Sequence, residues 1–317
     1  MSLGEFELIS KISRLFKRNP GVDVGIGDDT AVVTIGSEKL LLTCDALVEN
    51  SHFLLSWKSL VDNLFFYIGR KLISVSVSDV ASMGGAPLFS LVTLGIDSSL
   101  SESDLDKLYD GIRSALSDYG LSLVGGDTVR SENLFFDLFL TGRVRNGFML
   151  RSSAEPGDIV FVTGTFGDAK AGLEQLLKGK VTDSYLIDRF LNPAARLSEG
   201  QGALSLGVKC GTDVSDGLVF NLYTISEASN VRIDIELNLI PISDNLINYC
   251  GKERALSFAL FGGEDYELII TAPEEKEGEL QKIGFKPIGR VSEGRGVYGN
   301  GELLPKKGYD HLKGDNS

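Results

Sequence analysis

The chain has 317 residues, which is enough for two domains of ordinary size. Its 31 Lys and Arg residues against 44 Asp and Glu residues give a net charge of −13. This balance argues against nucleic-acid binding, because contacts to a phosphate backbone need a basic surface. Small phosphorylated ligands are not excluded, because carboxylates hold metal ions that supply the missing positive charge.

The cysteines and histidines restrict the compartment and the kinds of site. Three widely spaced cysteines form no C-x-x-C pair, which favours a reducing cytoplasm over a disulfide framework. Residues 1–5 do not resemble a signal peptide, and no apolar run reaches the roughly 18 residues of a membrane span. With only two histidines, His52 and His311, a multi-histidine zinc site is excluded.

The first half of the chain alternates predicted helices and strands. Apolar residues at helical spacing predict helices over residues 5–18, 58–83 and 101–119. The third of these has Ser101 as a candidate cap and Gly120 as a stop signal. Strands are predicted over residues 31–35, 40–43, 90–96, 121–124 and 134–144, the first two as a hairpin.

The second half of the chain alternates in the same way after a turn-forming segment at 154–158. Strands are predicted over residues 159–163, 231–237, 266–271 and 286–291, and helices over 168–177, 196–206 and 217–229. The predicted fold class is therefore α/β (α+β), with two domains over residues 1–148 and 149–317.

The standard nucleotide and catalytic motifs are missing from the sequence. It contains no G-x-x-x-x-G-K-[ST] P-loop, no H-E-x-x-H, no EF-hand loop and no G-x-S-x-G. Residues 294–299 fit G-x-G-x-x-G literally, but Asn300 and Gly301 follow them where a helix would be needed. We therefore interpret these glycines as turn residues.

Six acidic segments stand out because glycines or apolar runs flank the acids. They are GIGDD at 25–29, TCD at 43–45, SD at 78–79, GGDT at 125–128, DVSDG at 213–217 and GGEDYE at 262–267. In most of them an apolar run precedes the acid, which predicts that the acids lie at strand ends, where α/β proteins collect ligands.

Any one of these acids is more simply explained as a turn former or a helix cap. Six such sites in one chain are harder to explain in that way, because gathered carboxylates repel one another and are costly to desolvate. Mg²⁺ removes that cost, and neighbouring glycines let backbone amides approach phosphate oxygens. Composition and spacing together thus indicate Mg²⁺-dependent binding of a polyphosphate without a P-loop.

The acidic segments and their neighbours, in this order, resemble the thiamine-monophosphate kinase family, over nearly the whole length. This family belongs to a superfamily of ATP-binding enzymes that includes aminoimidazole ribonucleotide synthetase and selenophosphate synthetase. The matching segments are GIGDD at 25–29, TCDALVENSHF at 43–53, SVSDVASMGGAP at 76–87, LVGGDTVRS at 123–131, LRSSAEPGD at 150–158, DVSDGL at 213–218 and GGEDYEL at 262–268. Residues 308–311 close the chain in the family manner.

The resemblance implies ATP-dependent phosphorylation of thiamine monophosphate to thiamine diphosphate, with residues 1–148 as the ATP- and Mg²⁺-binding domain. It implies a homodimer that pairs the N-terminal sheets. The metal-binding residues it implies are Asp28, Thr43, Cys44, Asp45, Asp79, Asp127, Asp213 and Asp216. Contacts to ATP would come from Tyr109, Gly126, Asp127, Arg151 and Ser215. Contacts to thiamine monophosphate would come from His52, Glu264 and Tyr309.

One residue departs from the family pattern, because Cys44 stands where the family usually has a second Thr. A ligand is weakened if that position uses its hydroxyl, and nothing is lost if it uses its backbone carbonyl. Structural alternatives remain for three other residues: a surface ion pair for Arg151, a polar loop residue for His52 and an ordinary helix face for Tyr109.

The chemistry agrees with the resemblance, because a phosphate acceptor is already anionic near neutral pH, its second pKa being about 6. No general base is then needed, and we expect direct in-line transfer between two phosphates neutralised by Mg²⁺. The alternatives are a ring-closing purine synthetase or selenophosphate synthetase of the same superfamily, and a non-catalytic nucleotide sensor. The segment before GIGDD has no cysteine, which argues against selenophosphate synthetase.

Overall fold

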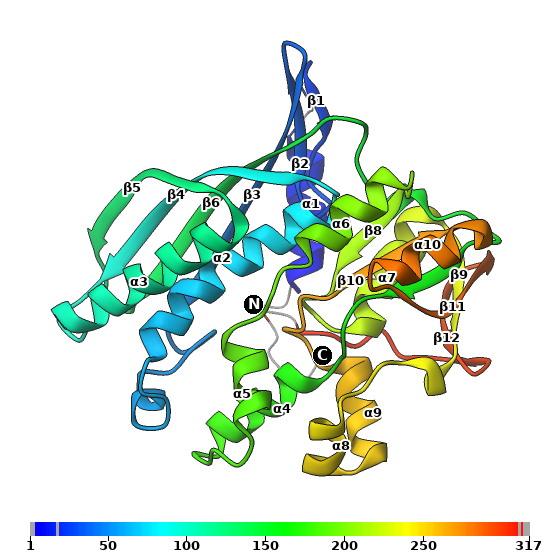
Figure 1. Ribbon diagram of the computed structural model, residues 1–317. Coiled ribbons are helices and arrows are strands. Elements are labelled where there is room, and N and C mark those ends of the chain that lie inside the picture. Colours follow the sequence, from blue (N-terminus) through cyan, green and yellow to red (C-terminus); the bar gives the residue numbers. More distant parts are fainter. Residues whose placement is uncertain (1–3, 17–18, 310–311, 313–317) are drawn as a thin grey trace.

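The computed structural model describes residues 4–16, 19–309 and 312. It has two β-sheets, one from each half of the chain, with helices packed on both (Figure 1). This mixed α/β architecture confirms the predicted fold class. In the part of the chain that the structure describes, no helix combines the length and the apolar character needed to cross a membrane.

The first sheet has six strands in the order β1-β2-β3-β6-β4-β5. The strands are β1 (Val22–Val24), β2 (Ala31–Ile35), β3 (Glu38–Val48), β4 (Ala86–Ile96), β5 (Ser122–Arg130) and β6 (Phe135–Val144). Neighbours are antiparallel except β4 and β5, which are parallel because α3 (Glu102–Tyr119) returns the chain between them. Ser101 caps α3 and Gly120 ends it with a left-handed conformation, as predicted.

The central helix of the molecule is α2 (Leu64–Ser82), which packs against the inner face of the first sheet and against α6 and β8 of the second half. It starts later than the predicted residue 58, because Leu55–Ser59 form a separate 3-10 helix. Leu60 closes that short helix by donating its backbone N–H to Trp57, and Asn63 takes the N-cap position of α2. Trp57 is buried in the same hydrophobic core as the inner side of α2.

The second sheet has seven strands in the order β13-β12-β9-β11-β7-β10-β8. The strands are β7 (Ile159–Val162), β8 (Cys210–Asp213), β9 (Val231–Ile235), β10 (Leu268–Ala272), β11 (Lys286–Glu293), β12 (Gly296–Gly299) and β13 (Glu302–Leu303). Both faces of β7 are buried: Ile159 and Phe161 belong to one apolar cluster, and Val160 and Val162 to another. No helix follows residue 299 among the described residues 300–309, so the literal G-x-G-x-x-G is no dinucleotide fingerprint.

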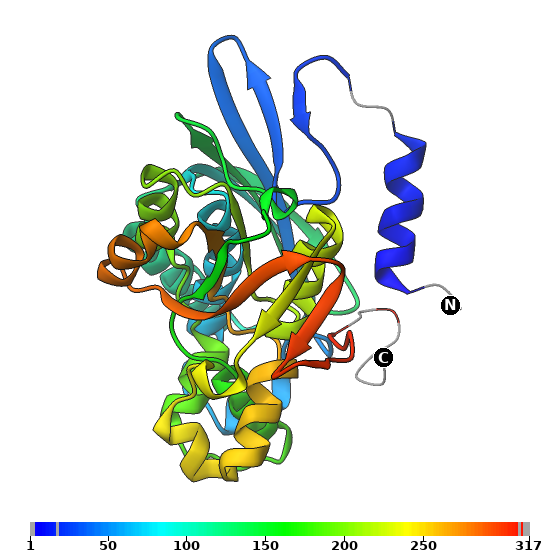
Figure 2. The same cartoon turned by 90° about the vertical axis from the view of Figure 1, so that its right-hand side faces the viewer.

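The remaining helices surround the two sheets. They are α1 (Glu5–Leu15), α4 (Asp168–Leu177), α5 (Ser184–Leu191), α6 (Leu197–Ser205), α7 (Leu218–Ser229), α8 (Asp244–Cys250), α9 (Lys252–Phe261) and α10 (Glu277–Lys282). Figure 2 shows α1 standing at the edge of the molecule, while α8 and α9 form its lower end. The predicted first helix thus ends at Leu15; residues 17–18 lie outside the described part.

Helices α2 and α3 approach each other closely at two glycines. A Cβ atom on Gly69 would lie 2.2 Å from the backbone oxygen of Leu108, and one on Gly111 would lie 2.0 Å from that of Phe66. Neither distance leaves room for a methyl group. Some glycines of this chain are therefore required by close helix packing and not by tight loops.

Gly111→Ala should lower the free energy of unfolding by about 2 kcal/mol, because the added methyl must push α3 away from the backbone of α2. Gly278→Ala in α10 is the matched control, since no atom from outside its own stretch of helix lies within 4 Å of the position of its Cβ. That change should be neutral or stabilise by up to about 1 kcal/mol, as alanine favours helix. Urea unfolding of both variants measures the difference, and equal stabilities would contradict the close contact.

Candidate active site

Three carboxylates from distant parts of the sequence converge between the two sheets. Asp29 precedes β2, Asp79 lies within α2 and Asp213 ends β8. One oxygen atom from each carboxylate lies within 4.8 Å of the other two. Such a group of charges is unfavourable without a counter-charge, and its oxygen donors are those that Mg²⁺ prefers. The donor set therefore fits a divalent cation.

Four hydroxyl groups hold the acids of this cluster in place. Ser76, Ser78 and Ser82 of α2 donate to Asp45 at 2.6 Å, Asp213 at 2.6 Å and Asp29 at 2.8 Å, respectively. Thr43 of β3 donates to Asp79 at 2.5 Å. The four acids and these hydroxyls, which we call the acidic cluster, thus connect β3, α2, β8 and the loop before β2.

Burial and mutual repulsion perturb the acids of this region. The pKa of Asp213 is raised to about 8, first by burial and then by the charge of Asp29. Burial also raises the pKa of Asp45 and raises that of Asp79 well above its usual range. The pKa of Asp28 is raised to about 7 by burial and by Asp29, partly offset by the charge of Arg151. A bound cation would reverse these shifts, because it favours the ionised carboxylates.

Arg151 is the positive charge that the protein itself places beside these acids. Its guanidinium forms an ion pair with Asp29 and donates to Thr212 Oγ1 at 3.1 Å, while its backbone N–H donates to Asp28 at 3.3 Å. The side chain is 20% exposed. Arg151 is therefore part of the site, and its interpretation as a surface ion pair is wrong.

The prediction that the acids lie at strand ends is wrong for three of the six segments. Thr43 and Asp45 lie inside β3, which continues to Val48 because apolar residues follow them. Asp79 lies inside α2, which continues to Ser82, and its side chain is half-buried. Residues 125–127 lie inside β5, which extends well beyond the predicted end at residue 124.

Asp127 is apart from the acidic cluster within this chain. It is exposed on the edge strand β5 and pairs in register with Thr93, which pairs in turn with Asp137. Three strand spacings of about 4.8 Å separate β5 from β3, so Asp127 lies roughly 14 Å from that strand. The placement of Asp127 in one cluster with Asp45 is therefore wrong for a single chain. Gly126 is required here, because its Cβ would lie 1.9 Å from Val92 O.

The thiol of Cys44 also points away from the acidic cluster. Cys44 donates to Asp137 Oδ1 at 3.2 Å, whereas its neighbours Thr43 and Asp45 contact Asp79 and Ser76 of α2. Successive residues of a strand face opposite sides of the sheet, which explains the difference. The thiol therefore faces away from the acidic cluster, which leaves the backbone carbonyl of Cys44 as its possible metal ligand.

Two of the residues predicted to contact thiamine monophosphate lie near each other. His52 follows β3, and its Nδ1 accepts a hydrogen bond of 3.0 Å from the backbone N–H of Val48. His52 is one of the groups that lower the pKa of Glu264, after Lys71, which places the two side chains in one neighbourhood. Glu264 donates its backbone N–H to Ser215 O at 2.7 Å. The GGEDYE segment therefore packs directly on the DVSDG segment.

The remaining predicted residues surround this region less closely. Asp216 lies just before α7, and its backbone N–H donates to Oδ1 of Asn221 in the first turn of that helix at 3.2 Å. Tyr309 follows Gly308, whose Cβ position lies 2.6 Å from the Phe220 ring of the same helix. Tyr109 is 41% exposed on α3, and no contact described above joins it to the acidic cluster.

Sequence analysis missed several residues of the site. Asp29 was passed over for its neighbour Asp28, although both acids of GIGDD were visible. Ser76, Ser78, Ser82 and Thr212 were also missed, because hydroxyl residues in an apolar segment are ordinary in sequence. The available signal was the run SVSVSDVAS, which places four serines and one aspartate in a helix too apolar to be exposed.

The family models match both halves of the chain. The model for "AIR synthase related protein, N-terminal domain" matches residues 27–144, and that for "AIR synthase related protein, C-terminal domain" matches residues 155–300. Structures of hydrogenase maturation protein HypE share this fold at lower identity, one in complex with ATP having 17% identity and a TM-score of 0.71.

Curated relatives are similar over the whole length. The thiamine-monophosphate kinase of Aquifex aeolicus is 38% identical, covering 98% of both chains. That of Escherichia coli K12 is 38% identical, covering 98% of this chain and 99% of the relative. The structure of AaThiL complexed with AMPPCP and TMP has 38% identity and a TM-score of 0.89, covering 98% of this chain and 99% of AaThiL. On the joint basis of this similarity and the acidic cluster, the chain belongs to the thiamine-monophosphate kinase family.

Proposed function

We propose that this protein transfers the γ-phosphoryl group of ATP to thiamine monophosphate, giving thiamine diphosphate and ADP. The observation that carries this proposal is the convergence of Asp29, Asp79 and Asp213 in a member of the thiamine-monophosphate kinase family. The complex of AaThiL with AMPPCP and TMP supports it. Family membership favours this function over a ring-closing or selenophosphate synthetase, and the intact acidic cluster favours it over a sensor.

The reaction needs neutralisation and alignment more than proton transfer, because both partners are phosphates. Bound Mg²⁺ would supply the charge that brings the two anions together. We propose that Asp28, Asp29, Asp45, Asp79 and Asp213 hold these ions. Asp216, Thr43 and the Cys44 carbonyl belong to the same proposed metal-binding set, and so does Asp127, as a contribution from a second copy of the chain.

The proposed substrate contacts follow from the same assignment. Arg151 and Ser215 would bind ATP beside the acidic cluster. Tyr109 on α3 would also contact ATP. His52, Glu264 and Tyr309 would bind thiamine monophosphate on the side where the GGEDYE segment lies. We also propose the boundary between the domains at residues 148 and 149, and a cytoplasmic location, which the three free cysteines support.

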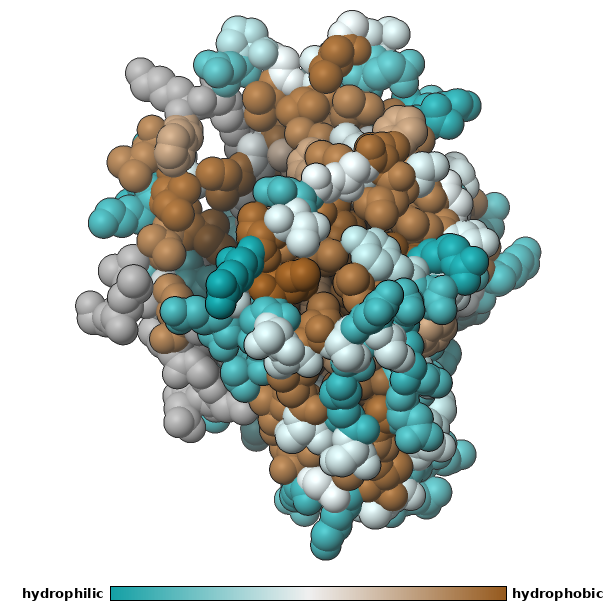
Figure 3. All heavy atoms as spheres, turned by 90° about the vertical axis from the view of Figure 1, so that its left-hand side faces the viewer, coloured by the Kyte–Doolittle hydropathy of each residue, from teal (hydrophilic) through white to brown (hydrophobic). Residues whose placement is uncertain are grey.

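A homodimer explains the position of Asp127. The outer face of the first sheet exposes large apolar side chains, among them Phe89, Leu91, Val124 and Val129. Figure 3 views the side of the molecule where β4 and β5 lie in Figure 1, and hydrophobic residues form a broad patch on it. Such a patch is typical of a protein interface. We propose that a second copy covers it and that Gly126 and Asp127 of one copy complete the ATP site of the other.

The activity test is formation of labelled thiamine diphosphate from ATP, Mg²⁺ and thiamine monophosphate. We expect ADP release to be slow when thiamine monophosphate is left out, because direct transfer needs the acceptor phosphate aligned with the γ-phosphate. Thin-layer separation of the products measures both reactions. Absence of thiamine diphosphate would overturn the proposed function, and rapid acceptor-independent ADP release would overturn direct transfer.

Stability should fall with rising pH when Mg²⁺ is absent. Acids with raised pKa values keep protons in the folded protein that the unfolded chain has already released. The free energy of unfolding should therefore decrease from the ordinary carboxyl range near pH ~4 through the values of about 7 for Asp28 and about 8 for Asp213.

Urea unfolding in EDTA across this pH range measures the slope. Asp213→Asn should flatten it, and Mg²⁺ should reduce the loss of stability at high pH, because the ion favours the charged acids. Asp97→Asn, on a loop after β4, is the control and should leave the slope nearly unchanged. An equal slope in wild type and Asp213→Asn would contradict the electrostatic description of the cluster.

The shared site can be tested by mixing two inactive variants. Asp127→Asn and Asp213→Asn should each lower turnover at least ~100-fold. Each change removes a carboxylate that would hold the cations that stabilise the charge of the transition state. If the site is shared, refolding an equal mixture should restore about a quarter of the wild-type turnover, because half of the random dimers then hold one native site. No recovery in mixed dimers, verified by differently tagged copies, would place Asp127 in the site of its own chain or in none.

A further inference from the structure

Lys71 is a buried cation that the proposed reaction does not yet use. It lies on α2, and its side chain is only 5% exposed. The ammonium donates to the carbonyl of Phe190 at 3.0 Å and lies 3.9 Å from the centre of the Phe190 ring. Its remaining contact is an ion pair with Glu264. Burying a charge is costly, so the three favourable contacts indicate that the surrounding residues stabilise this ammonium in a fixed position.

Glu264 lies in a segment whose backbone is held under strain. Glu264 and Tyr266 have φ angles of +71° and +51°, in the left-handed region that costs non-glycine residues of the order of 1 kcal/mol. Their backbone N–H groups donate to Ser215 O at 2.7 Å and to Val214 O at 2.8 Å. Strained positions of this kind persist where the surroundings fix them, and they gather at binding sites.

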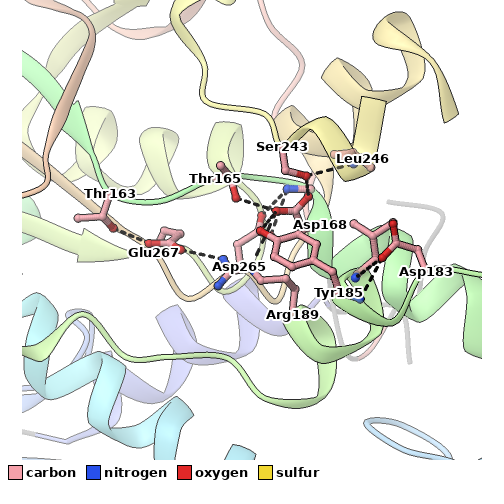
Figure 4. Close-up of polar contacts among 12 residues, drawn as sticks. Thr163, Thr165, Asp168, Asp183, Tyr185, Arg189, Ser243, Leu246, Asp265 and Glu267 are labelled. Atoms are coloured by element: carbon pink, nitrogen blue, oxygen red, sulfur yellow. Dashed lines mark hydrogen bonds and ion pairs between the residues drawn. The ribbon is translucent and has the colours of Figure 1, made fainter. Parts of the chain in front are cut away.

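A buried polar network anchors the far side of the same segment (Figure 4). The carboxylate of Asp265 accepts two hydrogen bonds from the backbone N–H of Gly167, at 3.1 and 3.0 Å. Glu267 accepts from Arg196 twice at 2.6 Å and from Arg189 at 2.8 Å. The residues that follow Glu264 are therefore fixed within the second half of the chain, whereas the side chain of Glu264 is fixed to α2 by Lys71.

The ion pair keeps Glu264 negatively charged. Burial raises the pKa of this carboxyl, but the charge and the contact of Lys71, with help from His52, more than offset it, so the pKa lies below its usual value. One carboxylate oxygen, Oε2, faces Lys71, and the other, Oε1, accepts from Tyr266 at 3.4 Å. The side chain is still 28% exposed, so a ligand can reach it.

Helix α2 also sets where this carboxylate lies relative to the reacting groups. Lys71 and Ser78 are seven residues apart, which is two turns on the same helix face and roughly 10 Å along the axis. Ser78 holds Asp213 of the acidic cluster. Glu264 is therefore placed for the organic part of a substrate whose phosphate reaches the acidic cluster.

We propose that Lys71 is a positioning residue for thiamine monophosphate. Its ammonium group holds the Glu264 carboxylate ionised and oriented toward the cationic thiazolium and aminopyrimidine part of the substrate. This inference rests on the proposed function. Lys71 acts through Glu264 and touches neither phosphate, so its loss weakens binding of thiamine monophosphate and leaves binding of ATP and the transfer step largely intact.

Steady-state kinetics of Lys71→Met tests the proposal. KM for thiamine monophosphate should rise at least ~10-fold, the typical cost of losing a charge-assisted contact. KM for ATP and kcat should stay close to the wild-type values. Lys71→Arg keeps the charge and should recover much of the loss. Equal increases in both KM values, or a loss confined to kcat, would overturn the positioning role.

Lys58→Met is a matched control for the loss of a lysine that pairs with a buried acid. Its ammonium lies 2.7 Å from Asp104, a side chain only 7% exposed, and 5.6 Å from the centre of the Phe65 ring. This variant should lose stability without a change in KM for thiamine monophosphate. If Lys71→Met raises that KM no more than Lys58→Met does, the effect is general destabilisation and the proposal fails.

The double variant Lys71→Met with Glu264→Gln keeps the proposal testable if Lys71→Met alone does not fold, since it leaves no unpaired buried charge. Because Lys71 acts through Glu264, the double variant should have the same KM for thiamine monophosphate as Glu264→Gln alone. A further increase would overturn the proposal. Wild-type protein that forms no thiamine diphosphate would instead overturn the proposed function, so the two failures are distinguishable.

Discussion

Repulsion between the carboxylates of Asp29, Asp79 and Asp213 is the constraint on which the arrangement of the site depends. One oxygen from each carboxylate lies within 4.8 Å of the other two, and Asp213 is buried while Asp29 and Asp79 are half-buried. Hydroxyl donors and one guanidinium offset part of this repulsion. They orient the acids without neutralising all of them. A site with such uncompensated charge is suited to bind cations and to bring two phosphates together.

Helix α2 connects the acidic cluster with both halves of the chain. Apolar residues on one side of it pack on the first sheet, and its serines and Lys71 contact residues outside that core. A helix normally exposes such polar residues, but here 15 of the 19 residues are buried. The polar side of α2 is therefore stable because the first half of the chain supplies Asp29 and Asp45 as partners, and the second half supplies Asp213, Glu264 and the Phe190 carbonyl.

The two faces of the first sheet have different tasks. Its inner face contributes Thr43 and Asp45 to the acidic cluster, while its outer face carries Cys44, Asp127, Asp137 and exposed apolar side chains. Alternation along β3 separates neighbouring residues of one sequence motif onto these two faces. A motif that is contiguous in sequence thus contributes some residues to the acidic cluster and others to the outer face of the sheet.

Much of the fold could be predicted from the sequence by local rules. The caps of α3, the apolar strands of both halves and the alternation of elements follow from residue types at fixed spacings, because those signals act within one or two turns of chain. Composition also indicated a carboxylate-based metal site, since glycine-flanked acids in an acidic chain leave few other uses. The family resemblance added the substrate, which no local rule would have given.

Tertiary structure alone decided which acids meet and which side chains hold them. Asp29 and Asp213 are far apart in sequence, and their distance follows from the packing of β8 on α2. Asp127 resembles the other acids in sequence, yet the strand order places it three strands away and on the opposite face. Sequence determined which residues can bind metal, phosphate or a cation, because that is a property of the side chain. Proximity, burial and orientation depend on long-range packing, which no local pattern encodes.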